Sequence, residues 1–205
     1  TSEGKTIDGL DADEIQQAEL GFKYNSPNYA FNVTGFYAVL SEQNSEFDKV
    51  FNVDYSSYGV ELEGAVKLGN FEVNAGATYT KAEITKSNNE DQVGNTPRRV
   101  PDLMFTISPS YRIDRAAIGL SFIGTTKVYA QFDNNVVLPG FTYVNAFASY
   151  NLTKGLSVRA NVNNLFDTFG ITEMEGDTFT DGAVNYMRGR PITGRAIDLT
   201  ISYQF

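Results

Sequence analysis

The chain ends on Arg195-Ala-Ile-Asp-Leu-Thr-Ile-Ser-Tyr-Gln-Phe205, a stretch in which apolar and polar residues alternate. Successive side chains of a strand point to opposite faces, so one face of this segment carries Ile197, Leu199, Ile201, Tyr203 and Phe205. The other face carries Ala196, Asp198, Thr200, Ser202 and Gln204. A two-faced strand of this length is able to cross a bilayer as one stave of a β-barrel, which takes about 9–11 tilted residues. The C-terminal stretch therefore predicts a transmembrane strand.

The same period of two recurs along the whole chain and predicts nine strands. Their expected ranges are 14–24, 29–40, 56–68, 71–84, 102–111, 116–130, 141–150, 156–166 and 194–205. Period-2 alternation is the signal of a two-faced strand, and no segment shows the 3.6-residue period of a helix. We therefore expect an all-β protein with almost no helix, an antiparallel transmembrane β-barrel of about nine strands.

The connections between these strands alternate in length. Four are short and rich in turn-forming residues: Asn25–Asn28, Gly69-Asn70, Arg112–Arg115 and Asn151–Gly155. The other four, residues 41–55, 85–101, 131–140 and 167–193, are long, polar and irregular in pattern. Outer-membrane barrels have short periplasmic turns and long external loops. The expected organisation is an acidic loop segment over residues 1–13, followed by barrel strands over 14–205 whose long loops are external.

Aromatic residues give a further indication of membrane insertion. Seven border the short turns and share the apolar face: Tyr24, Tyr29, Phe71, Tyr111, Tyr150, Tyr203 and Phe205. Tyr37, Tyr58 and Tyr79 lie toward the long loops and are candidates for the opposite girdle. The alternative is a soluble sandwich with the apolar face as its core, but strands of soluble proteins average about 5–6 residues. The strands expected here are about twice that length.

Composition excludes several classes of function. The 205 residues include no His and no Cys, and the net charge is −9. An acidic chain disfavours nucleic-acid binding. The P-loop and the dinucleotide and serine-hydrolase motifs are absent, and zinc or triad chemistry that depends on His is impossible. We expect no enzyme, no cofactor and no metal site. Residues Thr1–Leu10 lack the features of a signal peptide, as in a mature chain or one without its N-terminal part.

The final quarter of the chain carries a family resemblance. Leu156-Ser-Val-Arg-Ala-Asn-Val-Asn-Asn-Leu-Phe-Asp167, followed by a long loop and Gly194–Phe205, resembles the C-terminal end of TonB-dependent outer-membrane receptors. Looser similarity extends to Tyr58-Gly-Val-Glu-Leu-Glu63 and Leu138-Pro-Gly-Phe-Thr142. The resemblance implies a barrel of about 22 strands with an N-terminal plug domain in its lumen. The chain looks like the last nine strands, and these residues include neither a plug nor a TonB box.

The resemblance also implies a function and its partners. The function is active uptake of a scarce nutrient across the outer membrane of a Gram-negative bacterium, with a ferric siderophore, a carbohydrate or a cobalamin-like compound as ligand. The partners are outer-membrane lipid and lipopolysaccharide, the N-terminal barrel and plug portion, and, through the plug, the inner-membrane energy transducer. The assembly machinery would read the signal Ile197, Leu199, Ile201, Tyr203 and Phe205. The alternative is a small self-closing outer-membrane barrel with a structural or adhesive role.

Candidate site residues fall into two groups. Polar and charged residues of the external loops are the candidate ligand-binding set: Glu42, Asp48, Asp54, Arg98, Arg99, Asp133, Asn134, Glu173, Glu175, Arg188 and Arg190. The four arginines could hold an anionic ligand or lipopolysaccharide phosphates, or could pair with carboxylates such as Glu90 and Asp91. Residues on the polar side of the strands are expected to line the lumen: Glu61, Glu63, Glu72, Arg159, Asn161, Asn163 and Asp198.

Overall fold

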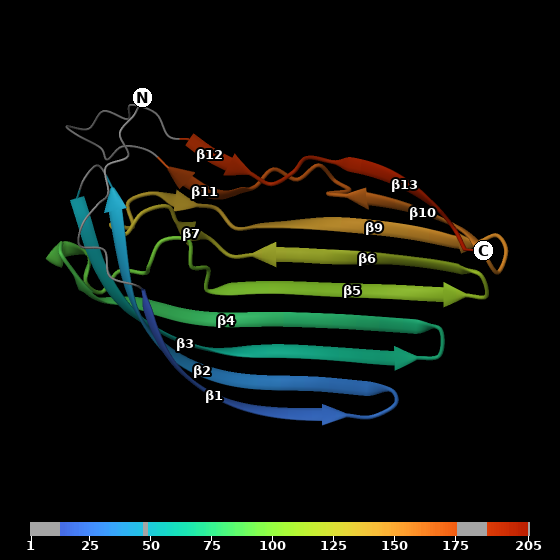
Figure 1. Cartoon of the computed structure of the whole chain (residues 1–205), viewed down its shortest axis with the longest axis horizontal. Coiled ribbons are helices and arrows are strands. Elements are labelled where there is room, and N and C mark those ends of the chain that lie inside the picture. The colour runs from blue at the N-terminus through green and yellow to red at the C-terminus, as the bar shows by residue number, and fades with distance from the viewer. Residues whose placement is uncertain (1–12, 47–48, 176–187, 205) are drawn as a thin grey trace.

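Nine antiparallel strands form a single curved sheet in the computed structural model, which describes residues 13–46, 49–175 and 188–204. Figure 1 shows the strands side by side in the order β1-β2-β3-β4-β5-β6-β9-β10-β13. Their bounds are β1 (Glu14–Asn25), β2 (Tyr29–Glu46), β3 (Lys49–Leu68), β4 (Phe71–Ser87), β5 (Leu103–Ile113), β6 (Ala116–Thr125), β9 (Phe141–Asn151), β10 (Leu156–Asn163) and β13 (Ala196–Tyr203). The all-β prediction is therefore confirmed.

The connections follow the predicted alternation of short and long. Tight turns join β1–β2, β3–β4, β5–β6 and β9–β10 at one end of the sheet, and the long connections lie at the other end (Figure 1). Two small hairpins lie in the long connections: β7 (Val128–Tyr129) with β8 (Val137–Leu138), and β11 (Ile171–Glu175) with β12 (Arg188–Pro191). The described residues include a three-residue 3-10 helix, Glu90–Gln92. None of their helices is long and apolar enough to cross a membrane.

The prediction of an irregular loop over residues 41–55 is wrong. Strands β2 and β3 continue as paired backbone from Ser41↔Asp54 to Glu46↔Lys49, so this connection is a long hairpin. The predicted strand 116–130 is also wrong in part, because it divides into β6 and β7 at Thr126-Lys127. Alternation predicts a strand only where its two faces meet different environments, and a hairpin in water on both sides loses that pattern.

Strand register sorts the side chains into two faces. The apolar face carries rows such as Val33↔Leu62, Leu62↔Ala77 and Ala77↔Phe105. The polar face carries Thr34↔Glu61 and Glu61↔Thr78 in the neighbouring row. On the apolar face Phe31 and Leu199 are 43% and 67% exposed. This face is therefore not the core of a soluble sandwich.

Aromatic side chains of the apolar face lie in two groups, as the sequence predicts. Tyr37 is paired directly with Tyr58 toward the long connections, and Phe71 is paired with Tyr111 beside the short turns. These aromatic residues are half exposed or nearly so. Phe205, expected in the same group and in the assembly signal, lies outside the described residues.

The sheet does not close on itself. Within the described residues β1 pairs only with β2, and β13 pairs only with β10. Each outer edge therefore presents a row of backbone N–H and C=O groups. Such an edge is unfavourable in hydrocarbon, where each unpaired group costs several kcal/mol. The open sheet fits one section of the wall of a larger barrel.

Buried hydrophobic side chains are concentrated among the long connections. Ile84 and Val53 are buried at the loop ends of β4 and β3. A second cluster contains Val128, Ala130 and Leu138, with Ile171 and Met174 packed against it. The long connections thus have a hydrophobic core of their own, which the two-faced wall does not provide.

Candidate functional site

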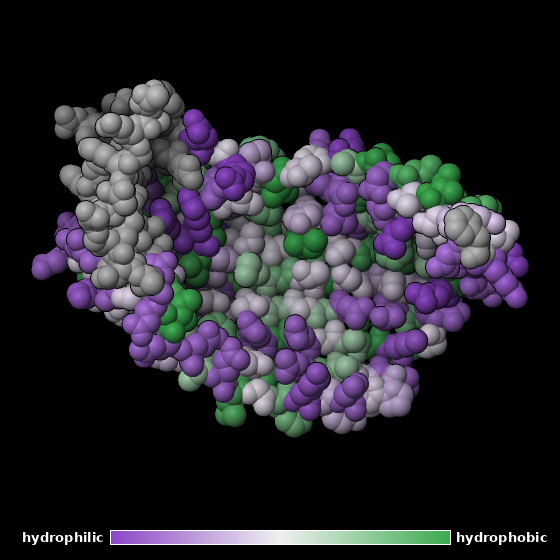
Figure 2. Space-filling model, viewed as in Figure 1, coloured by the Kyte–Doolittle hydropathy of each residue, from purple (hydrophilic) through white to green (hydrophobic). Residues whose placement is uncertain are grey.

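The polar face and the long connections border an open hollow of about 660 Å³. Sheet residues on its wall include Glu61, Glu63, Thr78, Met104, Phe141 and Tyr143. The connections contribute residues including Arg99, Pro101, Ile171, Thr172 and Ile192. Figure 2 shows that the visible face is hollowed and that hydrophilic residues are spread over it among weakly polar ones. The hollow has aromatic and apolar walls with a few charged groups, a common composition of small-molecule sites.

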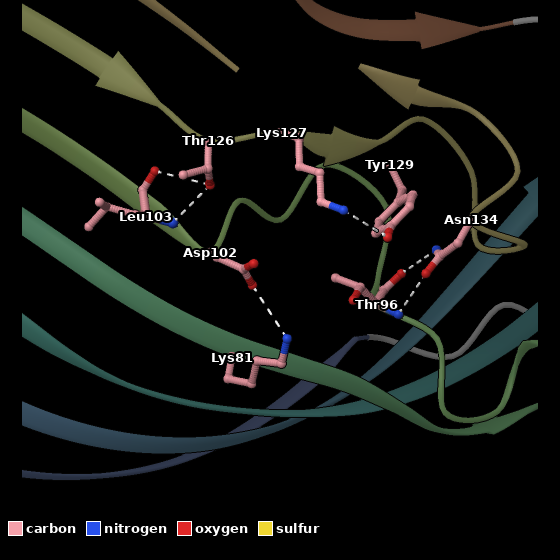
Figure 3. Close-up of polar contacts among 8 residues, drawn as sticks. All are labelled: Lys81, Thr96, Asp102, Leu103, Thr126, Lys127, Tyr129 and Asn134. Atoms are coloured by element: carbon pink, nitrogen blue, oxygen red, sulfur yellow. Dashed lines mark hydrogen bonds and ion pairs between the residues drawn. The ribbon is translucent and has the colours of Figure 1, made fainter. Parts of the chain in front are cut away.

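Hydrogen bonds hold two of the connections together beside this hollow (Figure 3). The Asn134 side chain accepts from the Thr96 backbone N–H at 3.0 Å, and its Nδ2 donates to the Thr96 carbonyl at 2.8 Å. Nearby, the Leu103 N–H donates to Thr126 Oγ1 at 3.1 Å, where β6 ends. Asn134 has a φ of +58°, a conformation that Asn tolerates better than most residues. We therefore assign Asn134 to loop structure.

Glu173 on β11 lies between two arginines from different connections. Its carboxylate is 3.1 Å from Arg99 Nη1 and 2.7 Å from Arg190 Nη1. The Glu173 side chain is 17% exposed, while that of Arg190 is 75% exposed. These three predicted ligand-binding residues therefore do come together, beside the hollow that Arg99 lines. Glu173 is thus one carboxylate partner of Arg99, whereas the sequence suggested carboxylates such as Glu90 and Asp91.

The other predicted loop residues are dispersed. Asp54 accepts a hydrogen bond from Ser41 and is 4.0 Å from Lys86 Nζ. Asp133 accepts from the Asn135 backbone and side chain. Arg98 lies over the Phe132 ring at 4.8 Å, and Arg188 is exposed at the start of β12. The side chains of Glu42 and Glu175 and the whole of Asp48 lie outside what the structure describes.

The residues predicted to line the lumen share the polar face. Glu61 and Glu63 lie on the wall of the hollow, and Glu72 accepts from Asn74 at 3.0 Å near the short turns. Arg159, Asn161 and Asp198 form a connected chain of hydrogen bonds. Asn163 ends β10 and is exposed. That this face lines a lumen stays a prediction.

The sequence interpretation missed the structural role of Asn164. Asn164 is only 2% exposed and has a φ of +49°. Its Nδ2 donates to the Thr168 and Thr193 carbonyls at 2.9 and 3.0 Å, and its Oδ1 accepts from the Thr168 N–H at 2.8 Å. Asp167 Oδ1 accepts from the Arg195 N–H at 2.8 Å. The segment Asn163–Asp167 thus joins the start of the loop after β10 to its return into β13.

Comparison with known proteins identifies the class of this arrangement, the β-barrel wall of a receptor. Residues 2–165 match the family model for the TonB dependent receptor-like β-barrel. Because that match covers more than half of the chain, the protein belongs to this family, as the sequence resemblance predicts.

Individual relatives agree with that assignment. The chain is 26% identical over 176 residues to the probable TonB-dependent siderophore receptor PiuA of Acinetobacter baumannii, covering 77% of this chain and 24% of the relative. It is 27% identical over 168 residues to the ferrichrome outer membrane transporter/phage receptor of Escherichia coli, and the match covers 74% of this chain and 22% of the relative. Among solved structures, the ferric yersiniabactin uptake receptor FyuA of Yersinia pestis superposes with a TM-score of 0.81 at 19% identity, covering 96% of this chain and 32% of that one.

The chain therefore spans about a quarter of the length of the curated relatives it matches. Those relatives are receptors and transporters, not enzymes. Neither the self-closing structural or adhesive barrel nor carbohydrate uptake receives support from these relatives. The open edges of β1 and β13 fit a section of a larger receptor wall better than a small closed barrel.

Proposed function

We propose that this chain forms the C-terminal barrel wall of an outer-membrane receptor that takes up a ferric siderophore. The single observation that carries this proposal is the hollow on the polar face, which residues of the long connections line at one end. The three relatives described above are named for a siderophore, ferrichrome and ferric yersiniabactin, which supports an iron complex over a carbohydrate.

The proposed binding surface is the wall of the hollow together with the Arg99–Glu173–Arg190 cluster. Phe141, Tyr143 and Met104 offer apolar and aromatic contacts to an organic chelator. Two arginines share one carboxylate at the cluster, so this part of the site is positive overall. Its donors are able to bind the carboxylate, hydroxamate or phenolate oxygens of such a complex by charge-assisted hydrogen bonds.

We propose the remaining parts of the transport cycle by analogy with the family. A plug domain would occupy the lumen and transmit energy from the inner-membrane transducer, and lipid would surround the apolar face. The predicted location is the outer membrane of a Gram-negative bacterium. Contact with lipopolysaccharide, and recognition of the C-terminal strand by the assembly machinery, are further proposals that follow from that location.

Growth under iron limitation tests the proposed function. A strain that lacks the complete gene is supplied with one iron source at a time. The sources are single ferric siderophores, ferric citrate, and iron held by a chelator that the strain cannot use. At least one ferric siderophore should restore growth only when the gene is returned. Arg99→Gln should raise the concentration of that siderophore needed for half-maximal growth by about 10-fold, the effect of losing one charge-assisted hydrogen bond. Growth on every iron source without the gene would refute the proposal.

A further inference from the structure

A chain of contacts across four strands fixes one arginine on the polar face. Arg159 Nε on β10 donates to Asn161 Oδ1 at 2.8 Å, and Asn161 Nδ2 donates to Asp198 Oδ1 on β13 at 2.6 Å. The Arg159 guanidinium carbon lies 4.4 Å from the centre of the Phe147 ring on β9. Phe147 itself lies over Gly119 on β6, where a Cβ would come within 2.4 Å of the ring. The guanidinium is thereby held along one edge and on one face.

The other edge of this guanidinium remains available. Arginine has five N–H donors in a planar fork, and the bond to Asn161 uses only the one on Nε. Neither terminal nitrogen of Arg159 makes a hydrogen bond or ion pair within the described part of the chain, and the residue is exposed. Two parallel donors on a fixed plane match the two oxygens of a carboxylate. Because the side chain is already ordered, binding loses little further entropy.

The position of Arg159 identifies the kind of partner. Arg159 is the fourth residue of β10, which starts at the short turn after β9, whereas the hollow lies at the loop end of the sheet. A solute captured by the loops would reach Arg159 last, but a domain that fills the lumen would touch it permanently. The chain spans about a quarter of its curated relatives, and a complete receptor of their length would have polypeptide outside these residues for such a domain.

We propose that Arg159 docks a carboxylate side chain of the domain that fills the receptor lumen. The contact is bidentate, between the terminal guanidinium nitrogens and an Asp or Glu of that domain. Asn161, Asp198 and Phe147 are positioning residues that act through Arg159. The proposal rests on the receptor assignment of the proposed function, but it does not depend on which solute is carried.

Hydrogen exchange of the lumenal domain in the complete receptor tests this docking contact without any ligand. Arg159→Gln should increase exchange in one segment of that domain by about 10- to 100-fold, the effect expected from losing hydrogen bonds to a charged group. Arg159→Lys should give a smaller increase, since it keeps the charge but loses the planar fork. The matched control is Lys67→Gln, because Lys67 is an exposed cation of the polar face, opposite Glu72 in the register of β3 and β4.

Three outcomes would overturn the docking contact. These are unchanged exchange in Arg159→Gln, an equal increase in Lys67→Gln, and loss of the folded, heat-modifiable barrel in Arg159→Gln, which would make Arg159 a support of the wall itself. As a positive test, Arg159→Glu should also increase exchange in that segment, and an Asp→Arg or Glu→Arg change within the segment should restore slow exchange. Failure of iron-dependent growth would refute the proposed function and leave these exchange rates unaffected.

Discussion

Placing a charge on the apolar face tests the orientation of the whole sheet. Leu62 on β3 is half exposed and paired with Val33 and Ala77. It lies four residues from Tyr58, or about 14 Å along a strand at about 3.4 Å per residue. With a strand tilt near 45°, Leu62 is about 10 Å below that girdle, near the middle of an apolar band about 25 Å tall.

A cation at this depth is costly, so Leu62→Arg should destabilise the complete receptor by about 2–4 kcal/mol. Val73 is only two residues from Phe71 in the other girdle, about 7 Å along the strand, so Val73→Arg should cost only about 0–1 kcal/mol. The matched control is Thr78→Arg. Thr78 lies in the row next to Ala77 but on the polar face, so its substitution should be close to neutral.

Denaturant titration of the receptor in phospholipid vesicles measures these free energies of unfolding. The expected order of destabilisation is Leu62→Arg, then Val73→Arg, then Thr78→Arg. If Leu62→Arg and Thr78→Arg destabilise the receptor equally, the two faces are not in different solvents, and the barrel interpretation fails.

Three further predictions concern the loops and the edges. Asn164→Ala removes three side-chain hydrogen bonds at a buried site and should lower the stability of the loop after β10 by about 3 kcal/mol. Hydrogen exchange at the Thr168 amide measures this loss, with Asn163→Ala as the control. Equally slow exchange in the two variants would contradict the role of Asn164. Glu173→Gln should weaken the tie between β11 and Arg99 by about 1 kcal/mol, as expected for a partly exposed ion pair. Limited proteolysis near β11 should then be several-fold faster, whereas Asp133→Asn should leave the rate unchanged, and equal rates would refute the tie. Residues 1–205 expressed alone should not give a monomeric folded barrel, because β1 and β13 would keep open edges; heat-modifiable migration as an isolated monomer would contradict this.

The strands of the wall were predictable from the sequence, whereas the structure within the long connections was not. A strand between lipid and water must alternate, so all nine strands of the sheet could be read from their period of two. In the proposed membrane position both faces beyond the tyrosine girdle would meet water, so alternation is not required there. The paired extension of β2 and β3 from Ser41↔Asp54 to Glu46↔Lys49 accordingly has no such signal. The structural role of Asn164 was missed for a related reason. Asn163 and Asn164 are adjacent residues of the same type, so nothing in the sequence pattern indicates which of them is buried.

Buried hydrophobic side chains are distributed differently at the loop end of the sheet and in the strands of the wall. In the proposed membrane position the strands of the wall would need no internal core, because their apolar face would pack against lipid. The loop end would have no lipid contact, and there Ile84, Val53 and the Val128–Leu138 cluster supply hydrophobic burial. Polar ties such as Asn134 to Thr96 then fix one connection against the next. A change in this loop core should therefore alter ligand binding without loosening the barrel, while a change such as Leu62→Arg should do the reverse.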